Sequence, residues 1–164
     1  MLHRKCAAVA VLLCCASPAI AATISMQDPV PFSETSFIAD NIKAECRMGT
    51  QLATAIGSNA PKFGNTIAFD SALATEGRVL KLEFVEAMSS RTGMNHYKVA
   101  TVRGVLLDDG QKVATVTARR VSRGGPGAMF KGSCDVLERV VNAIGADVAE
   151  WLANPTDDAK LGDF

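Results

Sequence analysis

Residues 97–121, YKVATVRGVLLDDGQKVATVTARRV, decide the fold of this 164-residue chain. Two runs rich in Val and Thr, residues 97–107 and 111–121, flank the tripeptide Asp108-Asp109-Gly110. β-Branched residues favour strands, and Asp and Gly tolerate the positive φ angles that a tight hairpin turn requires. In the second run small apolar residues alternate with polar or branched ones, so one face of that strand is expected to meet a helix layer. The stretch therefore predicts an antiparallel β-hairpin.

The segments on either side of this hairpin complete a predicted α+β fold. Residues 78–87 alternate as a further strand, residues 66–69 are a candidate short strand, and residues 89–95 are expected to form a loop. Apolar residues at spacings of three and four predict amphipathic helices over residues 34–56 and 133–152. Residues 22–33 contain two prolines and are expected to be an extended entry segment. We expect two layers: an antiparallel sheet of three to four strands flanked by an N-terminal and a C-terminal amphipathic helix.

The N-terminal residues predict export. A short basic region precedes an apolar run over residues 6–16, and Ala19-Ile20-Ala21 matches the pattern of a cleavage site. The apolar run is shorter than the roughly 20 residues that cross a bilayer, so no membrane span is expected. Cleavage after Ala21 would give a periplasmic or secreted bacterial protein. Lipid attachment at Cys14 or Cys15 is the open alternative.

The predicted domain organisation is a signal peptide over residues 1–21, one α+β domain over 22–153 and a flexible polar tail over 154–164. Basic residues concentrate in residues 78–131, and acidic residues in the segments before and after. These segments are expected either to pack together and neutralise one another, or to present a basic face to an anionic partner. Few aromatic residues and no recognisable motif speak against a nucleic-acid ligand.

Two cysteines, Cys46 and Cys134, remain after cleavage. An even number of cysteines in an oxidising compartment predicts a disulfide, here from the first predicted helix to the second. In the chain-entropy model such a long closed loop stabilises the fold by roughly 4 kcal/mol. The alternative is a small enzyme in which Cys134, at a helix N-terminus, is the nucleophile and His96 the base.

Two further groups of residues are candidates for binding. Met94-Asn95-His96 places a thioether and an imidazole in one predicted loop, which would suit copper, although one such pair is fewer ligands than a metal site usually has. The sequence predicts no cofactor. The basic residues Arg119, Arg120, Arg123 and Lys131 flank a Gly-rich stretch that leads into the second helix. This group is the expected binding surface.

A resemblance to known proteins rests on the order of the predicted elements. Two strands, a tight turn and a third strand are followed by the stretch RRVSRGGPG at residues 119–127 and by a helix that ends in Trp151-Leu152. It resembles small uncharacterised bacterial envelope proteins with a domain like that of curli-secretion-type lipoproteins or the N-terminal domain of the TolB type. The resemblance spans residues 78–152 and implies an envelope module that binds or assembles and does not catalyse. We therefore expect an exported non-enzymatic protein that acts through protein–protein contact. The alternatives are a small enzyme or copper binder using Cys134 or His96, and an inhibitor of a secreted enzyme.

Overall fold

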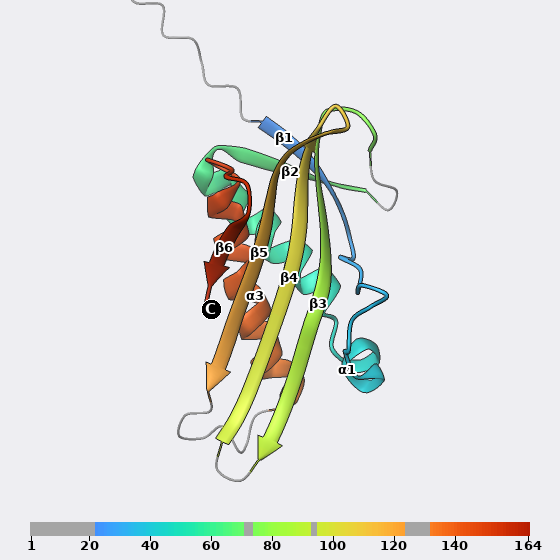
Figure 1. The fold of residues 1–164 in the computed structure, drawn as a ribbon, viewed down its shortest axis with the longest axis vertical. Helices are drawn as coiled ribbons and strands as arrows, with labels where there is room; N and C mark the ends of the chain where they lie inside the picture. Colours follow the sequence, from blue (N-terminus) through green and yellow to red (C-terminus); the bar gives the residue numbers. More distant parts are fainter. Residues whose placement is uncertain (1–21, 71–73, 93–94, 124–131) are drawn as a thin grey trace, which may run out of the picture.

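The structure is a computed structural model that describes residues 22–70, 74–92, 95–123 and 132–164 (Figure 1). The predicted signal peptide over residues 1–21 and the candidate binding residue Lys131 lie outside these ranges. The elements are β1 (Ala22–Gln27), α1 (Asp40–Glu45), α2 (Met48–Asn59), the 3-10 helix η1 (Ala60–Phe63), β2 (Asn65–Asp70), β3 (Arg78–Thr92), β4 (Asn95–Asp108), β5 (Gln111–Arg123), α3 (Ser133–Trp151) and β6 (Ala159–Gly162).

The fold is α+β with two layers, as predicted, but its sheet is larger than predicted and partly parallel. Six strands lie in the order β2-β1-β3-β4-β5-β6. The pairs β3–β4 and β4–β5 are antiparallel, whereas β1–β2, β1–β3 and β5–β6 are parallel. Helices α2 and α3 lie behind the sheet in Figure 1, and no helix or strand of the described residues covers the front of β3, β4 and β5. The prediction of a three- to four-stranded antiparallel sheet is therefore wrong in size and, for the outer strands, in direction.

The hairpin over residues 97–121 is confirmed and extends further than predicted. Asp108 pairs with Gln111, and the turn between them holds Asp109 at φ 46° and Gly110 at φ 78°. Both angles are positive, which explains why Asp and Gly occupy the turn. The predicted loop over 89–95 is wrong, because β3 runs on to Thr92 and β4 begins at Asn95. Polar residues can extend β3 and β4 because the hydrogen bonds between strands join backbone N–H and C=O groups and do not depend on the side chain.

The first strand was missed by the sequence prediction. Residues 22–27 form β1 between β2 and β3 and are not a simple entry segment. Ile24 and Met26 point into the core at 0% and 1% exposure. In the sequence only these two alternating apolar residues indicate a strand. The prolines at 29 and 31 favoured an extended segment outside the sheet. Parallel strands are also not joined by the tight turn that marks a hairpin, so no local sequence pattern predicts that β1 pairs with β2 and β3.

The predicted helix over residues 34–56 is two helices, α1 and α2. The chain leaves helical geometry at Cys46, where φ is −99° and ψ is 111°. The apolar spacing continues across this break, so periodicity alone could not locate it. The second predicted helix is confirmed as α3, although its N-cap is Gly132 and not Ser133. The Asp135 carboxylate accepts a hydrogen bond from the Gly132 N–H at 3.2 Å.

The C-terminal residues 159–162 form β6, so the predicted flexible tail is wrong there. β6 pairs in parallel with β5, from Val116↔Ala159 to Arg119↔Gly162. Gly162 has φ 95°, and a β-carbon there would collide with the carbonyl oxygen of Arg119. Two hydrogen bonds attach the residues just before β6 to β5. Thr115 donates to the Asp157 carboxylate at 2.7 Å and accepts from the Asp158 N–H at 2.9 Å. These contacts are long-range, and a polar composition gives no sign of them.

Candidate functional site

The predicted basic cluster is divided between the two faces of the sheet. Arg119 and Arg120 are neighbours on β5, and successive side chains of a strand point to opposite faces. Arg120 lies on the helix side and donates from Nε and Nη2 to the Asp147 carboxylate of α3, each at 2.7 Å. Its Nη1 also lies 3.6 Å from Oδ1 of Asp163. The hydrogen bonds to Asp147 raise the pKa of Arg120 above its ordinary value. Arg120 therefore ties α3 and the C-terminal segment to the sheet.

Arg119 lies on the opposite side of the sheet, in a polar row that crosses three strands. Glu86, Thr101 and Arg119 are in register on β3, β4 and β5. Thr101 donates to Oε2 of Glu86 at 2.7 Å, and Nε of Arg119 lies 3.7 Å from the same oxygen. Arg119 also donates from Nη2 to the Tyr97 hydroxyl at 2.8 Å and from Nη1 to the Asp163 carbonyl oxygen at 2.9 Å. The guanidinium is thus held in one orientation on the uncovered face.

We call the uncovered side of β3–β5 the outer sheet face, defined by Met88, Tyr97, Val113, Arg119 and Arg123. Met88 is 44% exposed and Val113 is 47% exposed, which is high for apolar side chains. Arg123 is exposed at the end of β5 and makes no ion pair with any residue in the described ranges. Tyr97, Arg119, Val121, Arg123, Asp163 and Phe164 line a hollow of about 540 Å³ on this side. The structure therefore brings Arg119 and Arg123 to one surface and places Arg120 elsewhere.

The basic middle of the chain is partly neutralised by its acidic C-terminal segment. Arg120 meets Asp147 and Asp163, and Nζ of Lys112 lies 3.5 Å from Oδ2 of Asp157. The pKa of Asp157 is lowered, mainly by the hydrogen bond from Thr115 and further by the Lys112 charge, against the opposing effect of desolvation. For these residues, the basic and acidic segments therefore pack together and neutralise one another, which is the first of the two alternatives that the sequence left open. Arg123 remains as exposed positive charge.

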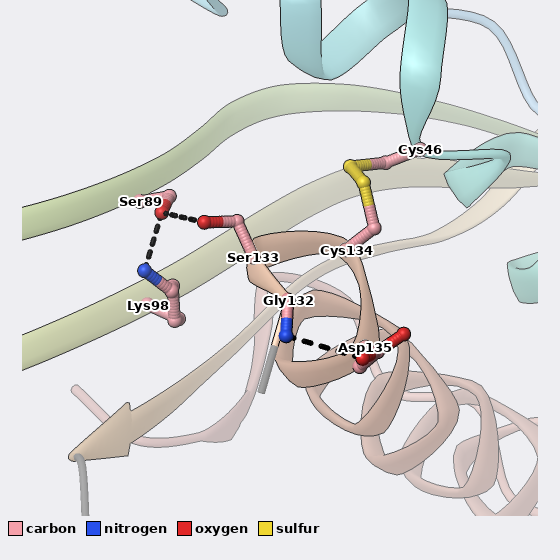
Figure 2. Close-up of a disulfide and its surroundings, with 7 residues drawn as sticks. All are labelled: Cys46, Ser89, Lys98, Gly132, Ser133, Cys134 and Asp135. Atoms are coloured by element: carbon pink, nitrogen blue, oxygen red, sulfur yellow. Dashed lines mark hydrogen bonds between the residues drawn. A yellow bond between two sulfur atoms is a disulfide. The ribbon is translucent and has the colours of Figure 1, made fainter. Parts of the chain in front are cut away.

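Cys46 and Cys134 form the disulfide that the sequence predicted, with their Cα atoms 5.1 Å apart (Figure 2). The bond joins the break between α1 and α2 to the first turn of α3. A nucleophilic cysteine must be a free thiolate. In the disulfide-bonded protein Cys134 is therefore not available as a nucleophile.

The copper hypothesis falls largely outside the described part of the chain. Met94 is not described, and His96 is placed only by its backbone, which pairs with Arg91 across the β3–β4 ladder. Within the described ranges no three or more His, Cys, Asp and Glu side chains gather closely enough to hold a metal ion. The helices of the same ranges include none that is long and apolar enough to span a membrane.

A buried polar chain beside the disulfide was missed in the sequence. Lys98 is only 4% exposed, and its ammonium group donates a hydrogen bond to Oγ of Ser89 (Figure 2). Ser89 in turn donates to Oγ of Ser133 at 3.0 Å. A sequence signal did exist, since Lys98 lies in phase with the inward-pointing Ala100 and Val102. A lysine at a core position of a strand marks a buried charge, which is costly and therefore informative.

The comparisons with known proteins show similarity of fold. No protein-family model matches the chain, and no curated protein matches it. A Xanthomonas campestris protein of the family DUF330 is similar, with a TM-score of 0.58 and 12% identity over 89% of this chain and 91% of that chain. A minor lipoprotein from Acinetobacter baumannii has a TM-score of 0.50 and 13% identity over 82% and 94% of the two chains. A hypothetical protein from Chlamydia trachomatis has a TM-score of 0.51 and 11% identity over 80% and 98%.

These similarities agree with the coarser part of the resemblance seen in the sequence. The neighbours are small bacterial proteins, and one of them is named a lipoprotein. They give no likeness that is specific to the curli-secretion or TolB types. At identities this low they show the fold and leave the function to be argued from the surface.

Proposed function

We propose that this protein is an exported, non-enzymatic binding or assembly module of the bacterial cell envelope, which acts through protein–protein contact at its outer sheet face. One observation carries the proposal: the three longest strands have helices on one face only, while the other face bears exposed apolar side chains. Met88 is in register with Val99 and Val121, eight residues along β5 from Val113, so the exposed apolar side chains are spread along a long uncovered face, and such a face is a candidate interaction surface. The disulfide supports export, since such bonds persist in oxidising compartments.

The side chains of the outer sheet face are those that contribute most to protein interfaces. Tyr, Arg and Met are enriched in such interfaces, and Tyr and Arg dominate their energetics. Tyr97 and Arg119 are already locked to each other by a hydrogen bond, so little conformational entropy would be lost when a partner binds them. The exposed Arg123 gives the surface a positive end. We therefore infer a protein partner that presents carboxylates next to apolar side chains.

Site-specific photo-crosslinking in the bacterium tests this proposal. A photoreactive phenylalanine analogue replaces Val113 or Arg123 on the outer sheet face, and a matched control replaces Glu138, which is exposed on α3. We expect one discrete protein adduct from positions 113 and 123 and none from position 138. An adduct of twice the chain's own mass would identify a second copy as the partner and make the protein an assembly module.

The control and a charge variant make the outcome decisive. In the charge variant Arg123→Glu, the adduct formed from position 113 should fall severalfold, because like charges would then face each other across the interface. Equal adducts from positions 113 and 138, or no adduct from either outer position, would contradict the proposal.

A further inference from the structure

Tyr97 and Arg119 form a bridge over the outer sheet face. Three successive rows of the β4–β5 ladder on this face are the pairs Tyr97↔Arg123, Val99↔Val121 and Thr101↔Arg119. The hydrogen bond from Nη2 of Arg119 to the Tyr97 hydroxyl therefore joins the first row to the third, and it spans the row that contains Val121. Val121 itself stays partly exposed beside the bridge.

The bridge forms one side of the hollow of about 540 Å³, and the C-terminal residues form the other. β4 lies on one side of β5 and the C-terminal segment on the opposite side (Figure 1). Asp163 donates its N–H to the Arg119 carbonyl oxygen at 2.7 Å, which holds Phe164 next to β5. The Phe164 side chain is 64% exposed. The hollow thus combines polar groups with the apolar surfaces of Val121 and Phe164, and its volume is usual for a ligand site.

The hollow contains hydrogen-bond donors that the described part of the chain leaves unused. The Tyr97 hydroxyl accepts from Arg119, and its own proton has no acceptor among the described residues. Arg123 forms no ion pair and no hydrogen bond with those residues, and its guanidinium is a fork of N–H donors. Tyr97 and Arg123 are directly opposite each other in the ladder, so the two side chains leave the sheet at neighbouring points and can donate to one ligand group.

The acidic groups around the hollow already have partners. The Asp163 carboxylate accepts a backbone N–H of β5 and faces Arg120 on the helix side of the sheet. The Glu86 carboxylate accepts from Thr101 and lies 3.7 Å from Nε of Arg119. A ligand of this hollow therefore has to bring its own acceptors. The unpaired guanidinium favours acceptors that carry negative charge, because charge-assisted hydrogen bonds are the stronger ones.

We propose that this hollow receives a carboxylate side chain of the protein partner, while an apolar side chain two positions away in the same extended segment packs on Val121 and Phe164. The inference rests on the proposed function and specifies how the outer sheet face recognises its partner. The carboxylate accepts the Tyr97 hydroxyl proton and pairs with Arg123, and Arg119 holds Tyr97 in position. Side chains two positions apart in an extended segment lie on one face, about 7 Å from each other, so both enter the same hollow.

Titration of the ¹⁵N-labelled protein with defined peptides, followed by NMR, tests the inference. The probe is the pentapeptide Thr-Glu-Thr-Leu-Thr, acetylated and amidated so that the Glu side chain is its one carboxylate. The matched control has Gln in place of Glu. We expect the Glu peptide to shift the amide signals of Tyr97, Val121, Arg123 and Phe164. The Gln peptide should bind roughly tenfold more weakly, as expected for loss of a hydrogen bond to a charged group.

Two variants and one control separate recognition from folding. Tyr97→Phe removes the hydroxyl and keeps the ring, so it should weaken the Glu peptide severalfold and leave the Gln peptide almost unchanged. Arg123→Gln should have the same selective effect. Arg139→Gln removes an exposed arginine from α3, on the helix side of the sheet, and should change the binding of neither peptide.

Three results would overturn the inference: equal binding of the Glu and Gln peptides, unchanged binding in both Tyr97→Phe and Arg123→Gln, or no shift with either peptide at millimolar concentration. Inorganic phosphate that shifts the same signals with equal affinity would overturn it in favour of an unselective anion site. If the peptides fail while the adduct from position 113 still forms, the proposed function stands and this inference alone is rejected.

Discussion

Replacing Gly145 of α3 by alanine sets two opposing effects against each other, and the structure decides between them. Alanine is the better helix former, by about 1 kcal/mol in a helix interior. At Gly145, however, a β-carbon would lie 2.5 Å from the Ala55 β-carbon of α2 and 3.2 Å from two backbone atoms of Ala55 and Ile56. None of these atoms belongs to a flexible side chain, so the two helices must move apart by about 1 Å to restore ordinary contact. Such overpacking costs about 1–3 kcal/mol.

We therefore expect Gly145→Ala to lower the free energy of unfolding by up to about 2 kcal/mol, because the packing cost of about 1–3 kcal/mol outweighs the propensity gain of about 1 kcal/mol. Urea denaturation followed by circular dichroism measures this change. The matched control is the exposed Asn142 on the same helix, where Ala and Gly variants give the propensity difference without the contact. At that position Ala should be the more stable variant.

A double-mutant cycle with Ala55→Gly tests the cause. Removing the Ala55 methyl group makes room for the new one, so the two substitutions together should cost less than their sum by about 1 kcal/mol or more. If Gly145→Ala instead stabilises the protein by as much as the Asn142 pair predicts, the close approach of α2 and α3 is refuted.

Three further predictions concern the disulfide and the C-terminal segment. Cys46→Ser and Cys134→Ser should each lower the free energy of unfolding by about 2–5 kcal/mol, and unchanged thermal melting in both would show that the bond contributes nothing. Asp157 has a lowered pKa when folded, so its contribution is present above the usual aspartate pKa of about 3.9 and is lost as the pH falls below it. The melting temperature of Asp157→Asn should therefore fall less steeply than that of the wild type below about pH 4, and parallel curves would exclude the effect. Gly162→Ala should detach β6 and speed hydrogen exchange of the β5 amides next to it, and unchanged exchange would contradict the steric argument.

The parts of the fold that the sequence could predict are those with a local signature. Asp109 and Gly110 specify the hairpin turn through their φ angles, and the α3 stripe repeats through five turns without interruption. The disulfide followed from the count of cysteines and the expected compartment. Each of these inferences needed only neighbouring residues or composition.

Most of the predictions that were wrong concern contacts between segments that are distant in the sequence. β1 and β6 pair in parallel with strands that are far away in the chain. Neither is joined to its partner by a tight turn that the sequence could reveal. The break at Cys46 is invisible in a pattern that continues on both sides of it. The prediction for the basic cluster counted charges along β5 without applying the alternation of a strand, which sends Arg119 and Arg120 to opposite faces. That alternation was available in the sequence and would have divided the cluster.

The division of the basic residues explains why α3 and the C-terminal segment matter to the outer sheet face. Asp163 lies where they meet: its carboxylate accepts the Val121 N–H at 2.9 Å and faces Arg120, while its carbonyl oxygen accepts from Arg119. Gly162 and Asp163 thereby close the edge of β5 and fix the guanidinium on the outer sheet face. The C-terminal segment thus completes the sheet beside β5 and holds the Arg119 guanidinium in a fixed orientation, so a change in that segment should alter the outer sheet face as well as the fold.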